Sequence, residues 1–180
     1  MKKLGLLTLL IMMFSNVSAA ETSGLMMINA DFGGDTLVDI TYTDGSTADI
    51  DAGRGITLGG GVNWNLSDDF ILQTTAAWKF TTIPQASNGD LTWTRIPLEA
   101  IAYYNIEKLR IGAGVSYHMS NRLKGTGFAS GATQDFDNAL GTVVGFEYLM
   151  TPGMSINVRY TMISYTPAGT SFEVDGNSIG

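Results

Sequence analysis

The chain has 180 residues, of which 44% are hydrophobic and 15% are charged, and its formal net charge is −7 at pH 7. An acidic chain with no basic cluster lacks the electrostatic footprint of nucleic-acid-binding proteins, so we expect no nucleic-acid partner. Cysteine is absent, which excludes disulfides. The length suits a single domain.

The first 19 residues have the pattern of a cleavable export signal. Lys2 and Lys3 precede an apolar run of 11 residues, and small residues follow near Ala19. A helix that crosses a bilayer needs about 20 apolar residues, so this run is too short to be a membrane anchor. We therefore assign residues 1–19 to a signal peptide and residues 20–180 to one exported domain.

After the signal, apolar and polar residues alternate with a period of two, which is typical of half-buried β-strands. The first alternating segment runs from Met26 to Tyr42, and the second from Ala48 to Trp64. The sequence TDGS between them predicts a hairpin, because Asp-Gly accepts the positive φ of tight turns. A 17-residue first strand is longer than an apolar membrane band of about 25 Å requires. We expect this hairpin to project beyond the lipid with four acidic residues, Asp39, Asp44, Asp49 and Asp51.

Six more strands are expected, which brings the total to eight. Five of them show the same alternation: Phe70–Phe80, Leu91–Tyr104, Leu109–Met119, Leu140–Met150 and Met154–Tyr165. The eighth is expected from near Ser171 to the chain end.

The connections alternate in length. Short ones lie at residues 65–69, 105–108 and 150–153, whereas residues 81–90 and 120–138 form longer ones. In an up-and-down arrangement, all the short turns fall at one end and all the longer loops at the other. This is the layout of outer-membrane β-barrels.

Alternation alone does not say which face of the sheet points inward, and a soluble sandwich or barrel would bury the apolar face. Two sets of residues favour the opposite orientation, in which the apolar face meets lipid. The polar face carries charges of both signs that can pair inside a closed cylinder: Lys79, Arg95, Glu99, Arg110, Glu147 and Arg159. The apolar face carries aromatic residues near strand ends, as an interfacial girdle would: Trp64, Trp78, Phe80, Tyr104, Tyr148 and Tyr160.

The short turns also suggest strand registers. Pairing Leu109 with Tyr104 would place Arg95 opposite His118. Pairing Met154 with Met150 would place Glu147 beside Asn157 and diagonal to Arg159. From the polar face we expect an interior polar cluster that comprises Arg95, Glu99, Arg110, Glu147 and Arg159, with Arg110, Glu147 and Arg159 in mutual contact.

With its export signal, eight alternating strands, short turns and longer loops, the chain resembles the small eight-stranded outer-membrane β-barrels of Gram-negative bacteria. That group includes the OmpA transmembrane domain and the opacity-type surface antigens. The resemblance implies residence in the outer membrane, outer-membrane lipid and lipopolysaccharide as neighbours, insertion by the barrel assembly machinery, and a monomer. It carries over no catalytic or ligand-binding residue.

The chain departs from this group at its last residues. Members end on a strand with an aromatic terminal residue, whereas this sequence stops at Ser178, Ile179 and Gly180. The alternatives are a truncated last strand or closure of the barrel by a very short one.

His118 and Ser120 are the weak catalytic candidates, since a spacing of two puts both side chains on one face of a strand. A His-x-Ser pair in a small outer-membrane barrel resembles the lipid A deacylases, which act on acyl chains. That face is also the one expected to point inward. The nearest candidates for a third group that would orient the histidine, Asp135 and Asp137, lie in a loop whose geometry the sequence does not fix. We therefore expect His118 to be an interior polar residue, with lipid A hydrolysis as an alternative.

An eight-stranded barrel has an interior just wide enough for its own side chains. We therefore expect a structural or surface-interaction role without catalysis, without a cofactor and without a metal, because the acidic residues lack the spacing of a calcium loop. A lateral uptake path for small hydrophobic molecules is a further alternative, since the glycines of the second strand leave local space.

Overall fold

The computed structural model of the chain describes residues 21–41, 45, 47–85 and 89–180. The expected signal peptide at residues 1–19 lies outside the described residues, and so does Asp44 of the first hairpin. No helix among the described residues is long and apolar enough to cross a membrane.

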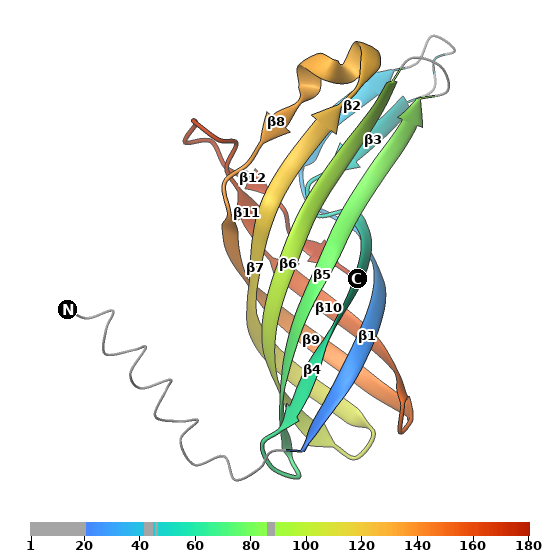
Figure 1. Cartoon of the computed structure of the whole chain (residues 1–180), viewed down its shortest axis with the longest axis vertical. Coiled ribbons are helices and arrows are strands. Elements are labelled where there is room, and N and C mark those ends of the chain that lie inside the picture. Colours follow the sequence, from blue (N-terminus) through green and yellow to red (C-terminus); the bar gives the residue numbers. More distant parts are fainter. Residues whose placement is uncertain (1–20, 42–44, 46, 86–88) are drawn as a thin grey trace, which may run out of the picture.

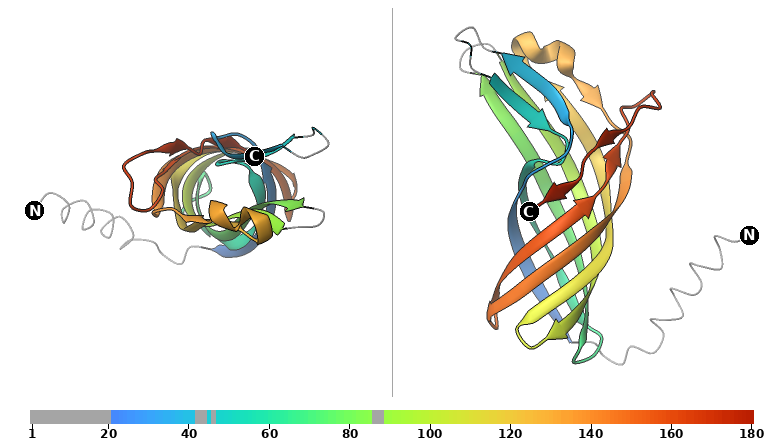
Figure 2. Two further views of the ribbon diagram at one scale, coloured as in Figure 1. Left: turned by 90° about the horizontal axis from the view of Figure 1, so that it is seen from above. Right: turned by 180° about the vertical axis from the view of Figure 1, so that it is seen from behind.

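Within the described part of the chain, eight strands follow one another in a single antiparallel sheet that curls into a tilted cylinder (Figures 1 and 2). In spatial order they are β1 (Thr22–Asp31), β4 (Gly55–Asn65), β5 (Phe70–Gln85), β6 (Gly89–Ile106), β7 (Leu109–Gly125), β9 (Ala139–Thr151), β10 (Met154–Met162) and β13 (Ser178–Ile179). The expected all-β, eight-stranded antiparallel architecture is confirmed.

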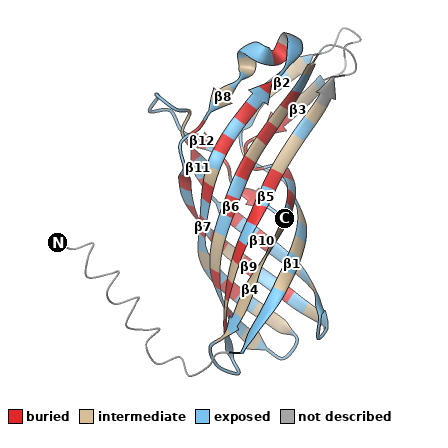
Figure 3. Ribbon diagram, viewed as in Figure 1, coloured by how far each residue is buried: buried red, intermediate tan, exposed pale blue. Residues whose placement is uncertain are grey.

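The apolar face of this sheet points outward. Side chains alternate between exposed and buried along each long strand (Figure 3). Trp78, Val115 and Val158 are 50%, 48% and 47% exposed, whereas Arg95 and Arg159 are 0% and 4% exposed. The predicted orientation, with the apolar face outward and the charges inward, is the one observed.

Two levels of outward aromatic rings mark the edges of the apolar band. Near the short turns, the rings of Phe70 and Tyr104 lie 5.1 Å apart, and further along β5 those of Trp78 and Phe80 stack at 4.5 Å. Ten residues of strand separate Phe70 from Phe80, which is about 33 Å of strand and about 25 Å along the barrel axis at a tilt near 40°. This height equals that of the hydrocarbon band that such barrels present.

The expected 17-residue first strand is wrong, because strand β1 ends at Asp31. Gly33 and Gly34 follow with φ of 120° and 87°, values that side-chain-bearing residues rarely adopt. A Cβ on Gly33 would lie 2.7 Å from the carbonyl oxygen of Asn177, so the neighbouring segment also requires glycine here. The chain leaves the barrel wall at this point and resumes as a separate hairpin.

Beyond the apolar band, the long connections fold together into a compact unit that we call the head (Figure 1). Its elements are β2 (Thr36–Thr41), β3 (Thr47–Asp51), the 3-10 helix η1 (Gly127–Ala132), β8 (Gln134–Asp135), β11 (Ser164–Tyr165) and β12 (Val174–Asp175). β2 pairs with β3, β11 pairs with β12, and β8 extends the edge of β7. The first hairpin therefore projects beyond the lipid, as expected, but it is folded into this unit.

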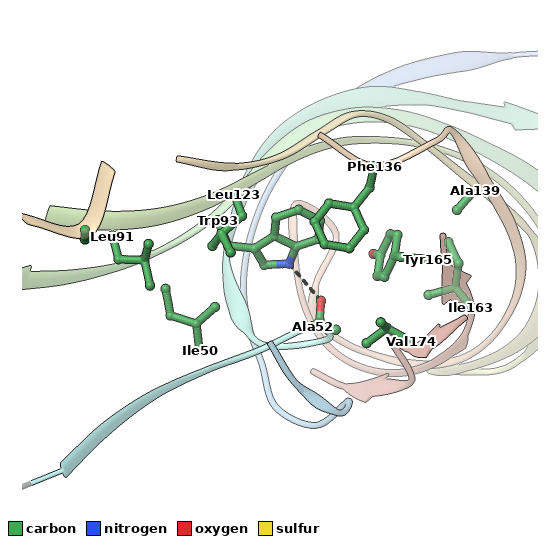
Figure 4. Close-up of a cluster of buried hydrophobic side chains, with 11 residues drawn as sticks. Ile50, Ala52, Leu91, Trp93, Leu123, Phe136, Ala139, Ile163, Tyr165 and Val174 are labelled. Carbon is green, nitrogen blue, oxygen red and sulfur yellow. Dashed lines mark hydrogen bonds between the residues drawn. The ribbon is translucent and has the colours of Figure 1, made fainter. Parts of the chain in front are cut away.

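The head has an apolar core of its own (Figure 4). The indole of Trp93 lies at its centre, against Phe136 and Tyr165 at ring distances of 4.9 and 5.5 Å. Trp93 Nε1 donates to the carbonyl oxygen of Ala52 at 2.9 Å. Ile50 of β3 is fully buried in this core, so an apolar residue of the expected alternating strand points inward here.

The strand ends differ from expectation at two further places. β7 runs on to Gly125 through Ser120, where φ is 55°. The last strand of the cylinder does not begin near Ser171, since β13 comprises only Ser178 and Ile179. β13 pairs with β10, and Ile179 forms an isolated bridge to Phe32, so these two residues join β10 to the end of β1 near the head.

Candidate functional site in the barrel interior

The polar face of the sheet forms a chain of ion pairs and hydrogen bonds between the head and the short turns. Nearest the turns, Arg110 on β7 lies directly opposite Glu147 on β9. Arg110 Nη1 donates to Glu147 Oε2 at 3.2 Å, and Ser155 donates to the other carboxylate oxygen. The expected positions of Glu147, beside Asn157 and near Arg110, are both confirmed.

Arg159 does not join that pair. It bonds to Glu99 across the barrel and to the side-chain oxygen of Asn157, the latter at 3.2 Å. The expected mutual contact of Arg110, Glu147 and Arg159 is therefore wrong. The structure has two separate ion pairs, because Glu99 on β6 supplies a second carboxylate. All four charged side chains lie inside the cylinder with their charges compensated, as burial of charge requires.

A third ion pair lies in the interior at the end of β1. Lys79 Nζ lies 3.3 Å from Asp31 Oδ2, and Thr57 donates to the same oxygen at 2.7 Å. Lys79 also reaches the hydroxyl of Ser178 at 3.5 Å. The interior thus links β5 and β4 to the end of β1 and to β13.

Arg95 occupies the boundary between this network and the head. Its guanidinium donates to the carbonyl oxygens of Ala52 and Arg54 and stacks over the ring of Trp93, 4.9 Å from the ring centre. Its Nε atom is buried without a partner among the described residues. Arg95 therefore fastens the loop after β3 to the barrel wall.

The expected pairing of Arg95 with His118 is wrong. Leu109 pairs with Ile106 rather than with Tyr104, which shifts the register by two residues and places Pro97 opposite His118. The register of β6 with β7 shifts again between Thr94 and Ile96, nearer the head.

His118 is buried, with 3% of its surface exposed. Its Nδ1 lies 2.6 Å from the Tyr165 hydroxyl and its Nε2 lies 3.0 Å from the Ser116 hydroxyl, which in turn donates to Glu99 at 3.1 Å. Tyr165 belongs to the head, outside the spanning strands, and burial raises the pKa of its phenol above the usual 10.0. The phenol is therefore protonated at neutral pH and available to hydrogen-bond to the imidazole.

Ser120 is not a partner of His118. It is exposed and adopts a φ of 55°, which separates it from the inward face on which the imidazole lies. The structure brings His118 together with Ser116 and Tyr165, in a buried chain of hydrogen bonds that faces the barrel interior.

Tyr103 is an interior residue that the sequence interpretation missed. Its ring lies across two facing glycines, where a Cβ on Gly112 would be 2.5 Å from a ring carbon and one on Gly145 would be 2.7 Å from the hydroxyl. Gly112 and Gly145 are direct partners on β7 and β9. The alternating glycines of these two strands were the available signal, since inward glycine leaves room for a neighbouring aromatic ring.

Tyr103, Arg110 and Glu147 line a cavity of about 740 Å³ in the interior. Its lining is mostly polar on the barrel side and includes Asn63 and Gln73, whereas residues of β1 and β10 border its lateral side. Between Lys79, His118 and Arg159 lies a cavity of about 20 Å³, enough for roughly one water molecule. In the part of the chain that the structure describes, no group of three or more histidine, aspartate or glutamate side chains could hold a metal ion.

The comparisons with known proteins agree with this architecture. The model of one protein family, described as outer membrane protein beta-barrel domain, matches residues 5–180. Neither the curated proteins nor the solved structures include a match to the chain.

Proposed function

The chain belongs to the outer membrane protein β-barrel domain family and resides in the outer membrane, and from this premise we propose that it is a non-catalytic membrane anchor that presents its head at the cell surface. In such barrels the short turns face the periplasm and the longer connections face the outside. The head is built from the long connections, so it lies on the outer side.

The observation that carries this proposal is the occlusion of the barrel beneath the head. The head core and the Arg95 guanidinium cover the upper end of the interior, and the ion pairs of Lys79 and Arg159 fill the level below. The space left between these groups is that of about one water molecule. An interior of this kind supports mechanical anchoring rather than passage of solutes.

The way the head is fixed supports a surface-interaction role. Its apolar core draws side chains from β3, β6, β7, β9 and β11, so the head and the barrel wall share one packed cluster. A rigid head costs less conformational entropy on binding a partner than mobile loops would. The acidic residues Asp39 and Asp49 lie on the outside of the β2–β3 hairpin.

Planar-bilayer recording tests the occlusion. We expect the purified wild-type barrel to give no stepwise conductance, because the head core and the polar network block the interior. Arg95→Ala and Trp93→Ala combined with Lys79→Ala and Arg159→Ala remove side chains from both blocking levels and should produce conductance, whereas Arg54→Ala at the head surface should not. Altered migration of unboiled samples in detergent gels establishes that each variant is folded. Stepwise conductance by the wild type would overturn the proposal.

A lateral uptake path is the second candidate, and the cavity of about 740 Å³ beside β1 and β10 favours it. Its inner wall, however, carries Arg110, Glu147 and Arg159, which suits polar rather than hydrophobic contents. Transfer of a fluorescent hydrophobic probe into proteoliposomes separates the two candidates. The anchor predicts the same transfer rate as protein-free vesicles.

Lipid A hydrolysis is the enzymatic alternative, with His118 and Ser120 as candidates. The lipid-facing surface of β7 holds Val115 and Tyr117, while the imidazole of His118 faces inward. We expect mass spectra of lipid A to show the same acyl pattern for cells with wild-type protein, with His118→Ala and without the protein. A deacylated species that depends on His118 would establish catalysis.

A further inference from the structure

Two basic side chains lie close together on the outer face of the wall, at the head side of the apolar band. Arg122 and Lys124 occupy alternate positions of β7, and both are exposed. Phe80 of the upper aromatic level pairs with Thr94, and Thr94 pairs with Arg122. Lys124 lies two residues nearer the head, which is about 5 Å along the barrel axis at a tilt near 40°. We call Arg122 and Lys124 the cationic pair.

Apolar side chains occupy the same outer face on the membrane side of the cationic pair. Ile96 and Leu98 of β6 are 37% and 39% exposed, and Tyr117 of β7 is 37% exposed. Leu98 and Tyr117 are direct partners across the two strands. The cationic pair thus continues the lipid-facing surface at the level where acyl chains give way to head groups. Long basic side chains at such a boundary lay their methylenes along apolar surface and place their charge among the head groups.

Threonines complete the polar part of this face. Thr82 on β5 and Thr92 and Thr94 on β6 lie on the outward side of their strands. The hydroxyls of Thr82 and Thr92 are 3.3 Å apart, and that of Thr94 donates to the carbonyl oxygen of Arg122 at 3.3 Å. Lys124 is the direct partner of Thr92. The face therefore offers hydroxyl groups beside two cations, which suits a ligand that carries both sugar hydroxyls and anionic groups.

The nearest carboxylate leaves both cations available to a ligand. Arg122 Nε lies 3.3 Å from Asp135 Oδ1, and 53% of the Arg122 side chain remains exposed. An ion pair at Nε engages only part of the guanidinium, whose other N–H donors can bind a second anion. Lys124 forms no ion pair with any described residue. Asp135 therefore positions the guanidinium without occupying all of it.

The rest of the head is acidic, which distinguishes the cationic pair from its surroundings. Among the described residues of the head, the other exposed basic residue is Arg54, and it is paired with Asp49 at 3.3 Å. The acidic residues away from the cationic pair are Asp35, Asp39, Asp49, Asp51, Glu173 and Asp175. An anionic ligand is therefore repelled over most of the head surface and attracted at the cationic pair.

We propose that this face of β6 and β7 binds a phosphorylated glycolipid of the outer leaflet. Its acyl chains lie on Ile96, Leu98 and Tyr117, and a phosphate monoester lies between Arg122 and Lys124. The planar guanidinium can bind phosphate with two hydrogen bonds, and lysine adds a point charge. Charge complementarity and continuity with the lipid-facing surface identify this occupant. The inference rests on the outward orientation of the head in the proposed function, because that orientation turns the cationic pair toward the outer leaflet.

Native mass spectrometry of the purified barrel in detergent measures the binding directly. The probe is lipid A with both of its phosphate groups, and the control lipid is the same lipid A after enzymatic dephosphorylation. EDTA is present throughout, so that no divalent cation bridges phosphate to carboxylates. Arg122→Gln/Lys124→Gln removes the cationic pair. The matched control, Arg54→Gln/Lys108→Gln, removes one exposed arginine and one exposed lysine elsewhere.

We expect the wild type to bind lipid A at least about tenfold more tightly than the dephosphorylated lipid, which corresponds to about 1.4 kcal/mol. Loss of the cationic pair should abolish this preference, whereas the matched control and the exchange Arg122→Lys/Lys124→Arg should retain it. Altered migration of unboiled samples in gels establishes that each variant is folded. Equal binding of the two lipids by the wild type, which requires no variant, would overturn the proposal. An equal loss in the matched control would also overturn it, because net charge and not this face would then govern binding.

The orientation of the head is tested separately, since the chain contains no cysteine of its own. Asp39→Cys in the head and Lys108→Cys at a short turn are treated in intact cells with a maleimide that does not cross membranes. We expect Asp39→Cys alone to react. Reaction of Lys108→Cys alone would overturn both the proposed function and this inference. Reaction of Asp39→Cys together with equal binding of the two lipids would overturn this inference alone.

Discussion

The head and the spanning barrel have opposite polarity, although the same strands run through both. In the head, Trp93 is buried against other aromatic rings, whereas in the barrel Trp78 faces outward and is half exposed. β6 shows the exchange directly: its inward residues are Leu91 and Trp93 in the head and Arg95 and Glu99 in the barrel. The surroundings set this pattern, because water encloses the head and acyl chains enclose the barrel.

The exchange occurs over a few residues. Outward threonines at positions 92 and 94 give way to Ile96 and Leu98, and the register of β6 with β7 is irregular between Thr94 and Ile96. The alternation of inward and outward residues is unbroken, and only the chemistry assigned to each side changes. At the membrane boundary, the inward residues of this continuous strand therefore change from apolar to charged, and its outward residues change from polar to apolar.

The largest expected effect is loss of the head core. Trp93→Ala should lower the free energy of unfolding by about 3–5 kcal/mol, because it leaves a cavity among buried rings and removes the bond to Ala52. Trp78→Ala, which removes an indole from the lipid face, should cost clearly less. Denaturant unfolding followed by circular dichroism measures both, and equal losses would contradict the distinction between an apolar-core head and an apolar-surface barrel.

An outward arginine should distinguish the two regions by position alone. Val115→Arg places a charge near the middle of the apolar band and should cost about 2–4 kcal/mol in lipid vesicles. Thr82→Arg also points outward, but it lies past Phe80 and outside the band, so it should change stability by no more than about 0.5 kcal/mol. Reversible folding in vesicles measures this difference. Similar costs at the two sites would place the membrane boundary elsewhere.

The smallest expected effect lies on the head surface. Asp49 and Arg54 form an ion pair at 3.3 Å whose side chains are nearly half exposed, and Asp49→Asn should cost no more than about 1 kcal/mol. Added salt should leave the variant unchanged and weaken the wild type slightly. A loss comparable to that of Trp93→Ala would show that this pair belongs to the folding core of the head.

Within the barrel, local sequence rules were sufficient to predict much of the structure. Alternation identified the strands, the charges of both signs on the polar face identified the inward side, and the position of Glu147 beside Asn157 followed from a short turn. The register across the β6–β7 turn was predicted two residues away from the observed one, so His118 lies opposite Pro97 and not opposite Arg95. Turns of similar length allow registers that differ by two without changing which face a residue occupies.

The head was the part that local rules described poorly. The alternation from Met26 to Tyr42 passes through Gly33 and Gly34 without interruption, so nothing in the period of two reveals that the chain leaves the wall there. The placement of Tyr165 on His118 joins residues 47 positions apart, and no local pattern encodes such a contact.

The sequence by itself determined the eight-stranded sheet and its outward apolar face, because the alternation of residue types along a strand is a local property and the charges on the polar face favour its enclosure. Only the tertiary structure decided which charges pair and how the head packs over Arg95. Those features depend on contacts between residues far apart in the chain, and such contacts become specified only when the sheet has curled.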